Sequence, residues 1–507
     1  MIADSFSSLV FGFGVLADPM NIAYMFVGVT LGVLIGVLPG LGGANGVAIL
    51  LPLTFSMSPT AAIIMLSSIY WGALFGGAIT SILFNIPGEP WSVATTFDGH
   101  PMAKQGRATE ALSYAFLSAA FGALFGVVII TLLAAPAAAF AHKFSSPEYF
   151  AVYFLAFACF VGLGGASPFK TLVSAGMGFS LAAVGMDTIS GSLRLTFGLP
   201  DLVKGVSFLV AVIGLFGIGE LIATMEERLE FRGVSARVSP RDVLKTIAAL
   251  PSYWIVLVRS SLVGCWMGIT PGGPTAASFM SYGLAKRFSP RSAEFGKGEP
   301  EGVIAPEAAD HSAGTSAMLP MLALGIPGSA TAAVMMGGLM IWGLHPGPMM
   351  FVEQKSFVWG LIASMYVANV VAVVLVLFSV PLFAAILRIP FAIIAPLIVV
   401  VCFVSAWTVS GSPFDLWLAF LFGLMGYLFK KCDYPIAPLV LAMVIGDKAE
   451  DAFRQSMIMH GGSLGAFWSN WLCGTLMTLA ILLLLWPLFS ALVRRRATPS
   501  AQEPVRE

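Results

Sequence analysis

Four short motifs place proline next to glycine inside apolar sequence, where they could open the backbone to a ligand. They are Gly36-Val-Leu-Pro-Gly-Leu-Gly42, Asn85-Ile-Pro-Gly88, Gly268-Ile-Thr-Pro-Gly-Gly-Pro274 and Gly325-Ile-Pro-Gly328. A Pro-Gly break in a membrane helix frees N–H and C=O groups, which must then face protein or a watery cavity. In secondary transporters, the N-terminus of such a half-helix meets anionic substrate groups, and unwound carbonyls hold a coupling cation. The motifs therefore predict a site for an anion and a cation.

Small polar residues beside the motifs complete the predicted anion site. Glycine allows close backbone approach, while Ser, Thr and Asn add hydrogen bonds without bulk. The alternative is that Gly and small residues only let membrane helices pack closely, but recurrence of the breaks at matched places favours a binding site. The predicted substrate-binding residues are Gly40, Asn45, Gly88, Ser92, Thr95, Gly272, Thr275, Ser278, Gly328, Ser329 and Thr331.

Four residues near the breaks are candidates for holding a coupling cation, either sodium or a proton. Asn45 and Asn85 offer side-chain oxygens suited to sodium. Glu89 follows Pro87-Gly88 in an apolar stretch, so it is either a cation or proton ligand or a surface carboxylate at a hairpin tip. Asp310 with His311 forms a titratable pair that favours a proton, or else lies in a surface loop, as Asp98 and Glu307 could.

The composition shows what kind of element carries these motifs. Of the 507 residues, 58% are apolar and 10% are charged, against roughly 45 to 50% and 25% in soluble domains. The 26 basic and 26 acidic residues balance, so no basic face exists for nucleic acid. We expect an all-α polytopic membrane protein of about 10 to 12 transmembrane helices plus broken or re-entrant helices.

Long apolar runs predict where uninterrupted spans lie, and two hydrophilic stretches predict loops. The loops are about 223–250 and 286–311. Neither is long enough for a soluble catalytic domain. The spans are expected at about 112–138, 147–165, 168–187, 201–222, 357–386, 390–410, 412–429 and 467–493.

The motifs indicate an internal duplication. The first motif recurs 232 residues later and the second 240 residues later, in the same order. Basic residues follow the first repeat and precede the second, which under the positive-inside rule predicts inverted topology, a periplasmic N-terminus and a cytoplasmic C-terminus. The expected division is a first membrane repeat (1–222), a cytoplasmic linker (223–250), a second membrane repeat (251–493) and a cytoplasmic tail (494–507).

At these motifs the sequence resembles the large membrane subunit of the tripartite tricarboxylate transporter family. The resemblance also covers Ala94-Thr-Thr-Phe-Asp-Gly-His-Pro101 and Pro300-Glu-Gly-Val-Ile-Ala-Pro-Glu307, and thus nearly the whole chain. It implies a transporter of the bacterial inner membrane that works with a small membrane subunit and a periplasmic solute-binding protein. Two departures stand out: Asp310-His311 replaces an expected Asn-Asn pair, and Glu89 and Trp91 replace small residues.

The predicted function is cation-coupled secondary uptake of tricarboxylates or related carboxylates by the large permease subunit of a binding-protein-dependent system. The alternative is a passive organic-anion channel. An enzyme is not expected, because the chain has no His-Glu-x-x-His and no Walker A sequence. The five cysteines lack CxxC spacing, so neither a disulfide nor a structural metal is expected, and no cofactor beyond the coupling ion. The other expected contact is membrane lipid.

Overall fold

The computed structural model describes residues 2–38, 41–163, 167–227, 239–270, 273–386 and 391–497. This part of the chain is almost wholly helical. Eight of its helical segments are long and apolar enough to cross a membrane. The predicted all-α polytopic membrane fold is confirmed.

The helices of the first half differ widely in length. They are α1 (Ile2–Leu16), α2 (Pro19–Val37), α3 (Gly43–Leu50), α4 (Pro59–Phe84), α5 (Val93–Met102), α6 (Ala108–Ala141), α7 (Ser146–Leu163), α8 (Pro168–Ala182), α9 (Phe208–Val212) and α10 (Gly219–Glu227). A single-turn 3-10 helix, η2 (Pro90–Ser92), precedes α5, and a π-helix, η5 (Ile213–Ile218), joins α9 to α10.

The helices of the second half include several short ones. They are α11 (Pro240–Ala249), α12 (Trp254–Ile269), α13 (Gly273–Phe288), α14 (Glu301–Ser316), α15 (Met318–Leu324), α16 (Ala330–Ile341), α17 (Met350–Glu353), α18 (Lys355–Ile386), α19 (Phe391–Ser410), α20 (Pro413–Lys431), α21 (Ile436–Met459) and α22 (Trp471–Ala497).

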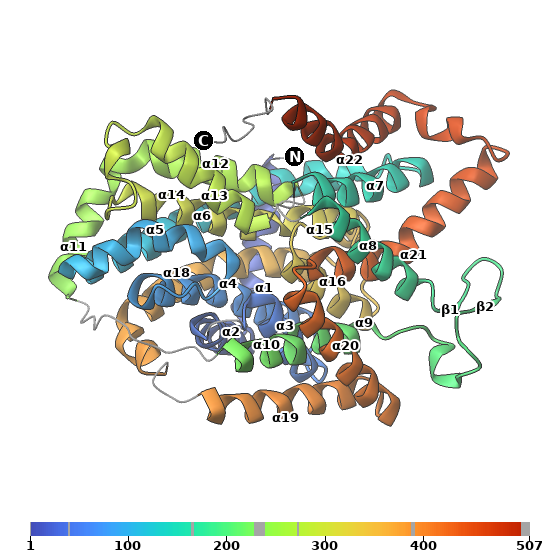
Figure 1. Cartoon of the computed structure of the whole chain (residues 1–507), viewed down its shortest axis with the longest axis horizontal. Helices are drawn as coiled ribbons and strands as arrows, with labels where there is room; N and C mark the ends of the chain where they lie inside the picture. Colours follow the sequence, from blue (N-terminus) through green and yellow to red (C-terminus); the bar gives the residue numbers. More distant parts are fainter. Residues whose placement is uncertain are drawn as a thin grey trace, which may run out of the picture.

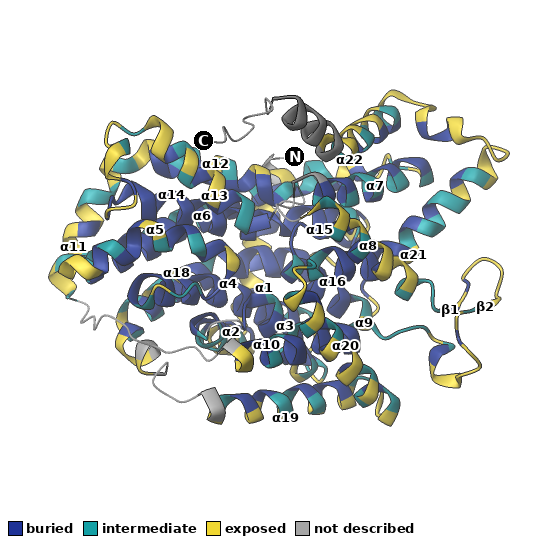
Figure 2. Ribbon diagram, in the orientation of Figure 1, coloured by how far each residue is buried: buried dark blue, intermediate teal, exposed yellow. Residues whose placement is uncertain are grey.

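Helix α4 forms the centre of the molecule. It begins with Pro59 at its first position, and the Ser58 hydroxyl caps it by accepting the Ala61 N–H at 3.3 Å. Its most apolar stretch is entirely buried inside the protein. In Figure 2 buried residues concentrate on the central helices, whereas α11 and the β hairpin are mostly exposed. A helix that is apolar all round belongs either in such an interior or in lipid.

Glycines bring α2 close against α4. A Cβ on Gly32 would lie 2.2 Å from the Ile69 carbonyl oxygen, and one on Gly36 would lie 2.2 Å from that of Ala73. Small residues at four-residue spacing let helix backbones approach in this way. The tight fit fixes where α2 ends relative to α4, and so positions the first break.

The same contacts recur between α12 and α14. A Cβ on Gly264 would lie 2.1 Å from the Ala309 oxygen, and one on Gly268 would lie 2.3 Å from the Ala313 oxygen. These glycines follow Gly32 and Gly36 by 232 residues, and the two alanines follow Ile69 and Ala73 by 240. The residues in contact between α12 and α14 are therefore separated from those between α2 and α4 by the same numbers of residues as the motifs. In Figure 1, α2 and α3 lie below α4 and α12 and α13 lie above it.

The predicted loop at 286–311 is wrong over its second part. Residues 301–311 belong to α14, and every residue of α14 is buried. By its contacts α14 is the counterpart of α4. Its Ala, Gly and Ser residues pack against α6, α12 and α13, so that its polar side chains face protein rather than water.

Three other boundaries differ from the prediction. The span expected at 201–222 begins only at Phe208, because residues 183–207 form a hairpin and loop. Part of the expected linker, 240–249, is helix α11. Helix α21 was not among the expected spans, because charged residues from Asp447 to Arg454 interrupt its apolar pattern.

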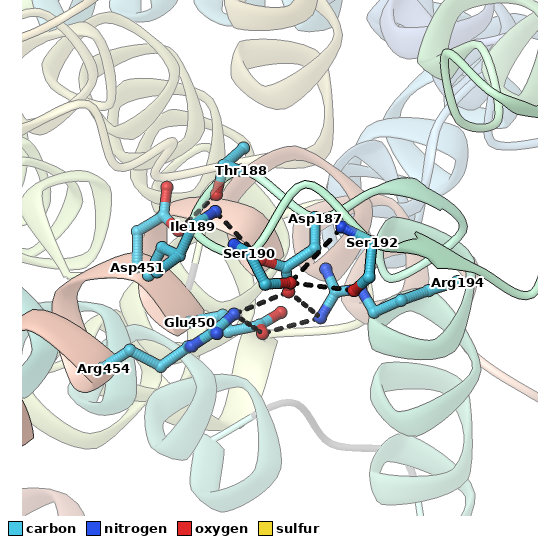
Figure 3. Close-up of polar contacts among 9 residues, drawn as sticks. All are labelled: Asp187, Thr188, Ile189, Ser190, Ser192, Arg194, Glu450, Asp451 and Arg454. Atoms are coloured by element: carbon cyan, nitrogen blue, oxygen red, sulfur yellow. Dashed lines mark hydrogen bonds and ion pairs between the residues drawn. The ribbon is translucent and has the colours of Figure 1, made fainter.

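A short hairpin projects at one end of the molecule (Figure 1). Its strands β1 (Gly185–Met186) and β2 (Leu193–Arg194) are antiparallel, with Gly185 opposite Arg194 and Met186 opposite Leu193. Figure 3 shows how its polar residues meet α21.

Ion pairs hold the hairpin to α21. Arg454 pairs with Asp187 at 2.7 Å, and Arg194 pairs with Glu450 at 2.7 Å. The Ser190 N–H and the Arg454 guanidinium hold the pKa of the Asp187 carboxyl well below its usual range.

Candidate functional site

Both described breaks have the same backbone form. Helix α4 ends at Asn85 with φ 57°, and α15 ends at Gly325 with φ 69°, each in the left-handed conformation. This conformation commonly ends helices and is tolerated best by Gly and Asn. The predicted breaks at Pro87-Gly88 and Pro327-Gly328 are therefore present.

The other two breaks are bounded by helix ends. Helices α2 and α12 end at Val37 and Ile269, and α3 and α13 begin at Gly43 and Gly273. The Pro-Gly pairs between them, and with them the predicted site residues Gly40 and Gly272, lie outside the described residues.

The helices that follow the breaks pack across the boundary between the two halves. Helix α3 of the first half packs against α16 of the second, and α13 of the second half packs against η2 and α5 of the first. One cross-contact is a hydrogen bond in which the buried Ser278 hydroxyl donates to the Trp91 carbonyl at 2.7 Å. This exchange brings the breaks of both halves into one interior region.

Gly88 and Gly328 make the same contact in their own halves. A Cβ on Gly88 would lie 2.4 Å from the Gly36 oxygen, and one on Gly328 would lie 2.4 Å from the Gly268 oxygen. Close packing alone therefore requires glycine at these two positions. Their N–H groups remain candidates for substrate binding.

Glu89 is buried, with 6% of its surface exposed. The Gly43 N–H, at the first position of α3, donates to its Oε1, and Ser92 Oγ accepts the Glu89 N–H at 3.2 Å. A carboxylate is stabilised at a helix N-terminus by the helix dipole and by the free N–H groups. Of the two readings of Glu89, the exposed hairpin tip is excluded.

The two candidate asparagines differ in position. Asn45 is buried in α3, two residues after Gly43, with 6% of its surface exposed. Asn85 is exposed, and its left-handed backbone accounts for an Asn where the second half has Gly325. Its position offers nothing that favours a buried sodium ion.

A compact titratable cluster lies in the middle of α14. Glu307, Asp310 and His311 are each at most 1% exposed. His311 Nδ1 lies 2.6 Å from Asp310 Oδ1 and 3.8 Å from Glu307 Oε2. The Thr95 hydroxyl on α5 donates to Glu307 Oε1 at 2.6 Å. The predicted residues Thr95 and Asp310 thus belong to one cluster.

Sequence reasoning placed Glu307 and His311 near the site but did not select them. Residues 307, 310 and 311 have the i, i+3, i+4 spacing that puts side chains on one helix face, which is the signal that could have joined them. Their ligand atoms all lie within 4.8 Å of one another, so the group meets the distance requirement for holding a cation.

Tyr70 lies between this cluster and the first break. A Cβ on Gly43 would lie 3.3 Å from its ring, and one on Gly314 would lie 3.0 Å from its hydroxyl oxygen. Its hydroxyl interacts with the Ser329 side chain, whereas Asp310 Oδ2 and His311 Nε2 are buried with no hydrogen-bond partner among the described residues. Buried polar atoms of this kind are costly unless they are paired, so water, a proton or an ion is the expected partner.

The remaining predicted residues lie at the starts of α13 and α16. The Ser329 hydroxyl caps α16 by accepting the Ala332 N–H at 3.2 Å, and Thr331 is buried in the first turn. Thr275 is half-buried in α13. The polar groups of Ser329 and of Ser92 are already used in capping their own segments.

Asp98 is structural. Its Oδ1 accepts the N–H groups of Gly296, Gly298 and Glu299 at 2.8 to 2.9 Å, and its Oδ2 accepts the Tyr282 hydroxyl at 2.9 Å. Both carboxylate oxygens of Asp98 therefore accept hydrogen bonds from within the protein, and the carboxylate fixes the loop before α14.

Comparisons with known proteins show which family and which proteins this chain is similar to. The family described as "Tripartite tricarboxylate transporter TctA family" matches residues 22–441. An Agrobacterium vitis protein described as "Uncharacterized 52.8 kDa protein in TAR-I ttuC' 3'region" is 35% identical over 482 residues, which cover 94% of this chain and 95% of that protein. A second Agrobacterium vitis protein, described by its place in the TAR-II ttuC' 3'region, is 33% identical over 234 residues, or 46% of this chain and 97% of that protein. No solved structure shows a significant match.

Proposed function

We propose a specific uptake role for this chain, which belongs to the tripartite tricarboxylate transporter TctA family. Membership makes it the large, multi-pass membrane subunit of a tricarboxylate transporter system. The proposal is that it takes up tricarboxylates or related carboxylates by secondary transport, driven by a sodium or proton gradient. Substrate would reach it from a periplasmic solute-binding protein, and a small membrane subunit would complete the system in the bacterial inner membrane.

One observation carries this proposal: the broken helices of both halves meet beside buried ionisable groups. Helix α3 packs on α16, α13 packs on η2, and Thr95 joins the region to Glu307. Ionisable side chains inside a membrane protein are expensive and usually belong to a substrate or ion pathway. Half-helix N-termini suit carboxylates, so anion and cation sites would be neighbours.

The recurrence of the helix contacts supports alternating access. If the two halves have inverted topology, with the N-terminus periplasmic and the C-terminus cytoplasmic, the breaks of one half open toward one side of the membrane and those of the other half toward the opposite side. When access from one side of the membrane closes and access from the other side opens, the bound carboxylate and cation cross the membrane together.

Transport by the purified system tests the proposal. The chain and its small subunit are reconstituted in proteoliposomes, and uptake of labelled citrate and smaller dicarboxylates is followed with or without the binding protein, under an imposed sodium or proton gradient. We expect accumulation above the external concentration that needs both a cation gradient and the binding protein. Gradient-independent equilibration without the binding protein would instead identify a passive anion channel.

A further inference from the structure

We infer that the coupling ion is a proton and that Glu307, Asp310 and His311 carry it. This inference rests on the proposed transport function and names the ion for it. We call these three residues with Thr95 the α14 cluster.

The cluster has the geometry of groups that share protons. His311 Nδ1 is within hydrogen-bond distance of Asp310 Oδ1 at 2.6 Å and of the Glu307 carbonyl at 3.0 Å. Asp310 Oδ2 and His311 Nε2 are buried and have no partner in the part of the chain that the structure describes. One oxygen and one nitrogen are therefore free to gain or lose a proton without breaking an existing contact.

Charge balance also requires a bound cation. The two carboxylates and one imidazole carry a net charge of −1 even when the imidazole is protonated. None of the ion pairs in the described part of the chain joins a Lys or Arg to Glu307 or Asp310. Uncompensated charge is strongly disfavoured in an interior shielded from water. An added proton on a carboxyl oxygen, forming an O–H bond, neutralises the cluster.

The elements packed around the cluster offer no other neutralising group. From α5, Asp98 is bound to the loop before α14, and His100 Nδ1 lies 3.0 Å from the Ile82 carbonyl. From α12, Arg259 lies over the Phe288 ring, 5.4 Å from its centre. The other titratable groups on these helices are Tyr70 of α4, Glu110 paired with Arg107 and Tyr114 of α6, Cys265 of α12, and Tyr282 with the exposed Lys286 and Arg287 of α13.

The contacts favour a proton over a metal ion. His311 Nδ1 lies 2.6 Å from Asp310 Oδ1, which is hydrogen-bond distance, so a proton and not a metal ion joins this pair. The His311 and Phe75 rings pack in a T-shaped arrangement, with ring centres 4.5 Å apart, so an apolar side chain lies against the imidazole. Sodium prefers oxygen ligands and would gain nothing from an imidazole.

Thr95 supplies the link to transport. With ionised Glu307, the Thr95 hydroxyl donates to Oε1; with protonated Glu307, the carboxyl O–H can donate to Thr95 instead. Thr95 belongs to α5 and Glu307 to α14, so a proton that passes from Asp310 or His311 to Glu307 changes a contact between the two halves. Release of the proton as hydronium on the other side restores the original bond.

Infrared spectroscopy of the purified full-length chain in detergent tests proton binding without transport. We expect a C=O band of a protonated carboxyl near neutral pH that is lost or shifted in Asp310→Asn or Glu307→Gln. Glu148→Gln is the matched control. Glu148 lies on α7, away from α14, and is a buried carboxylate that accepts hydrogen bonds from Ser145 and Asn470. Absence of the band from the wild type, or its persistence in both cluster variants, would overturn the inference.

Proteoliposomes then test coupling, with a pH-sensitive dye inside and the substrate gradient as the driving force. The double variant Asp310→Asn, His311→Asn should reduce substrate-driven proton entry at least tenfold, while Glu148→Gln leaves it unchanged. Sodium-driven accumulation with no dye signal would overturn the proton assignment alone. Tight binding of Mn²⁺ or Zn²⁺ to the wild type, abolished in the double variant, would also overturn the proton assignment. Failure to accumulate substrate under any gradient would overturn the proposed function itself.

Discussion

Glu89 and Ser329 occupy equivalent positions in the two halves, 240 residues apart. Each immediately follows Pro-Gly, and each has an extended backbone, with φ −143° and ψ 157° at Glu89 and φ −151° and ψ 164° at Ser329. Each also lies near the first residue of a half-helix, Gly43 of α3 and Gly273 of α13. The first half therefore places its own carboxylate where the second half has a hydroxyl.

This asymmetry predicts that Glu89 limits how many substrate carboxylates can bind. On the proposed function, a substrate carboxylate at α3 would be repelled by Glu89. Glu89→Ser should raise uptake of a tricarboxylate relative to a dicarboxylate roughly tenfold, since an anion at a helix N-terminus is worth up to about 2 kcal/mol. Competition between labelled citrate and a dicarboxylate in proteoliposomes measures the ratio.

The reciprocal change is the control for selectivity. Ser329→Glu adds a carboxylate at the second half-helix, so uptake of both substrates should fall. An unchanged ratio in Glu89→Ser together with unchanged uptake in Ser329→Glu would show that these half-helices do not bind the substrate.

Gly88→Ala should impair folding or transport because its methyl group has no space. A Cβ at Gly88 would lie 2.4 Å from the Gly36 oxygen, and Gly328→Ala meets the equivalent Gly268 oxygen. Such overpacking costs about 1 to 3 kcal/mol. Thermal unfolding in detergent should show similar losses for both variants. Gly176→Ala in α8 is the control, with nothing within 4 Å of its added methyl group; it should be neutral or slightly stabilising.

Asp98→Ala should destabilise the protein strongly, because three backbone N–H groups of the loop at 296–299 would lose their acceptor. Of these, Gly298 and Glu299 are buried and Gly296 is exposed, and an unsatisfied buried group costs about 1 to 3 kcal/mol. Asp98→Asn should cost less, since its amide oxygen can replace Oδ1. Thermal unfolding again measures both, and equal losses would contradict the hydrogen-bond account. Asp415→Asn, at a buried Asp that accepts from Ser410, controls for charge loss alone.

The hairpin attachment should depend on pH in one direction only. The pKa of Asp187 is lowered in the folded protein, so its contribution is fully present above the unfolded value of about 3.9 and is lost as pH falls further. Hydrogen exchange of residues 186–194, corrected for intrinsic rates, should thus be constant from about pH 5 to 8 and increase in acid. Asp187→Asn should increase exchange at neutral pH.

A variant without a titrating group separates charge from contact. Ser192→Ala removes the contact between the Ser190 and Ser192 hydroxyls, which lie 2.8 Å apart. Its effect on exchange should be the same at every pH. If Asp187→Asn behaves in the same way, the ion pair with Arg454 does not hold the hairpin.

The sequence was most informative where a backbone requirement forces a residue type. Pro87-Gly88 and Pro327-Gly328 marked real breaks, because left-handed helix ends and close approach to a carbonyl need such residues. The offsets of 232 and 240 residues also recur in the packing of α2 on α4 and of α12 on α14. The all-α membrane class followed from composition alone.

Hydropathy failed where polar residues face protein instead of water. Helix α14 was expected as part of a loop because Glu307, Asp310 and His311 lower its hydropathy, but its small residues let neighbouring helices enclose it. Helix α21 was missed since its charged residues bind the hairpin. Which side chains meet across the halves, such as Thr95 and Glu307, depends on tertiary packing that one sequence does not reveal.

The Asp98 contact also sets an order for assembly during synthesis. Its carboxylate is made about 200 residues before the loop whose N–H groups it accepts. Since chains emerge from the N-terminus, α5 is inserted before that loop exists. The loop at 296–299 acquires its acceptor only by docking on the earlier half, so the N-terminal half serves as the template on which the C-terminal half completes its fold.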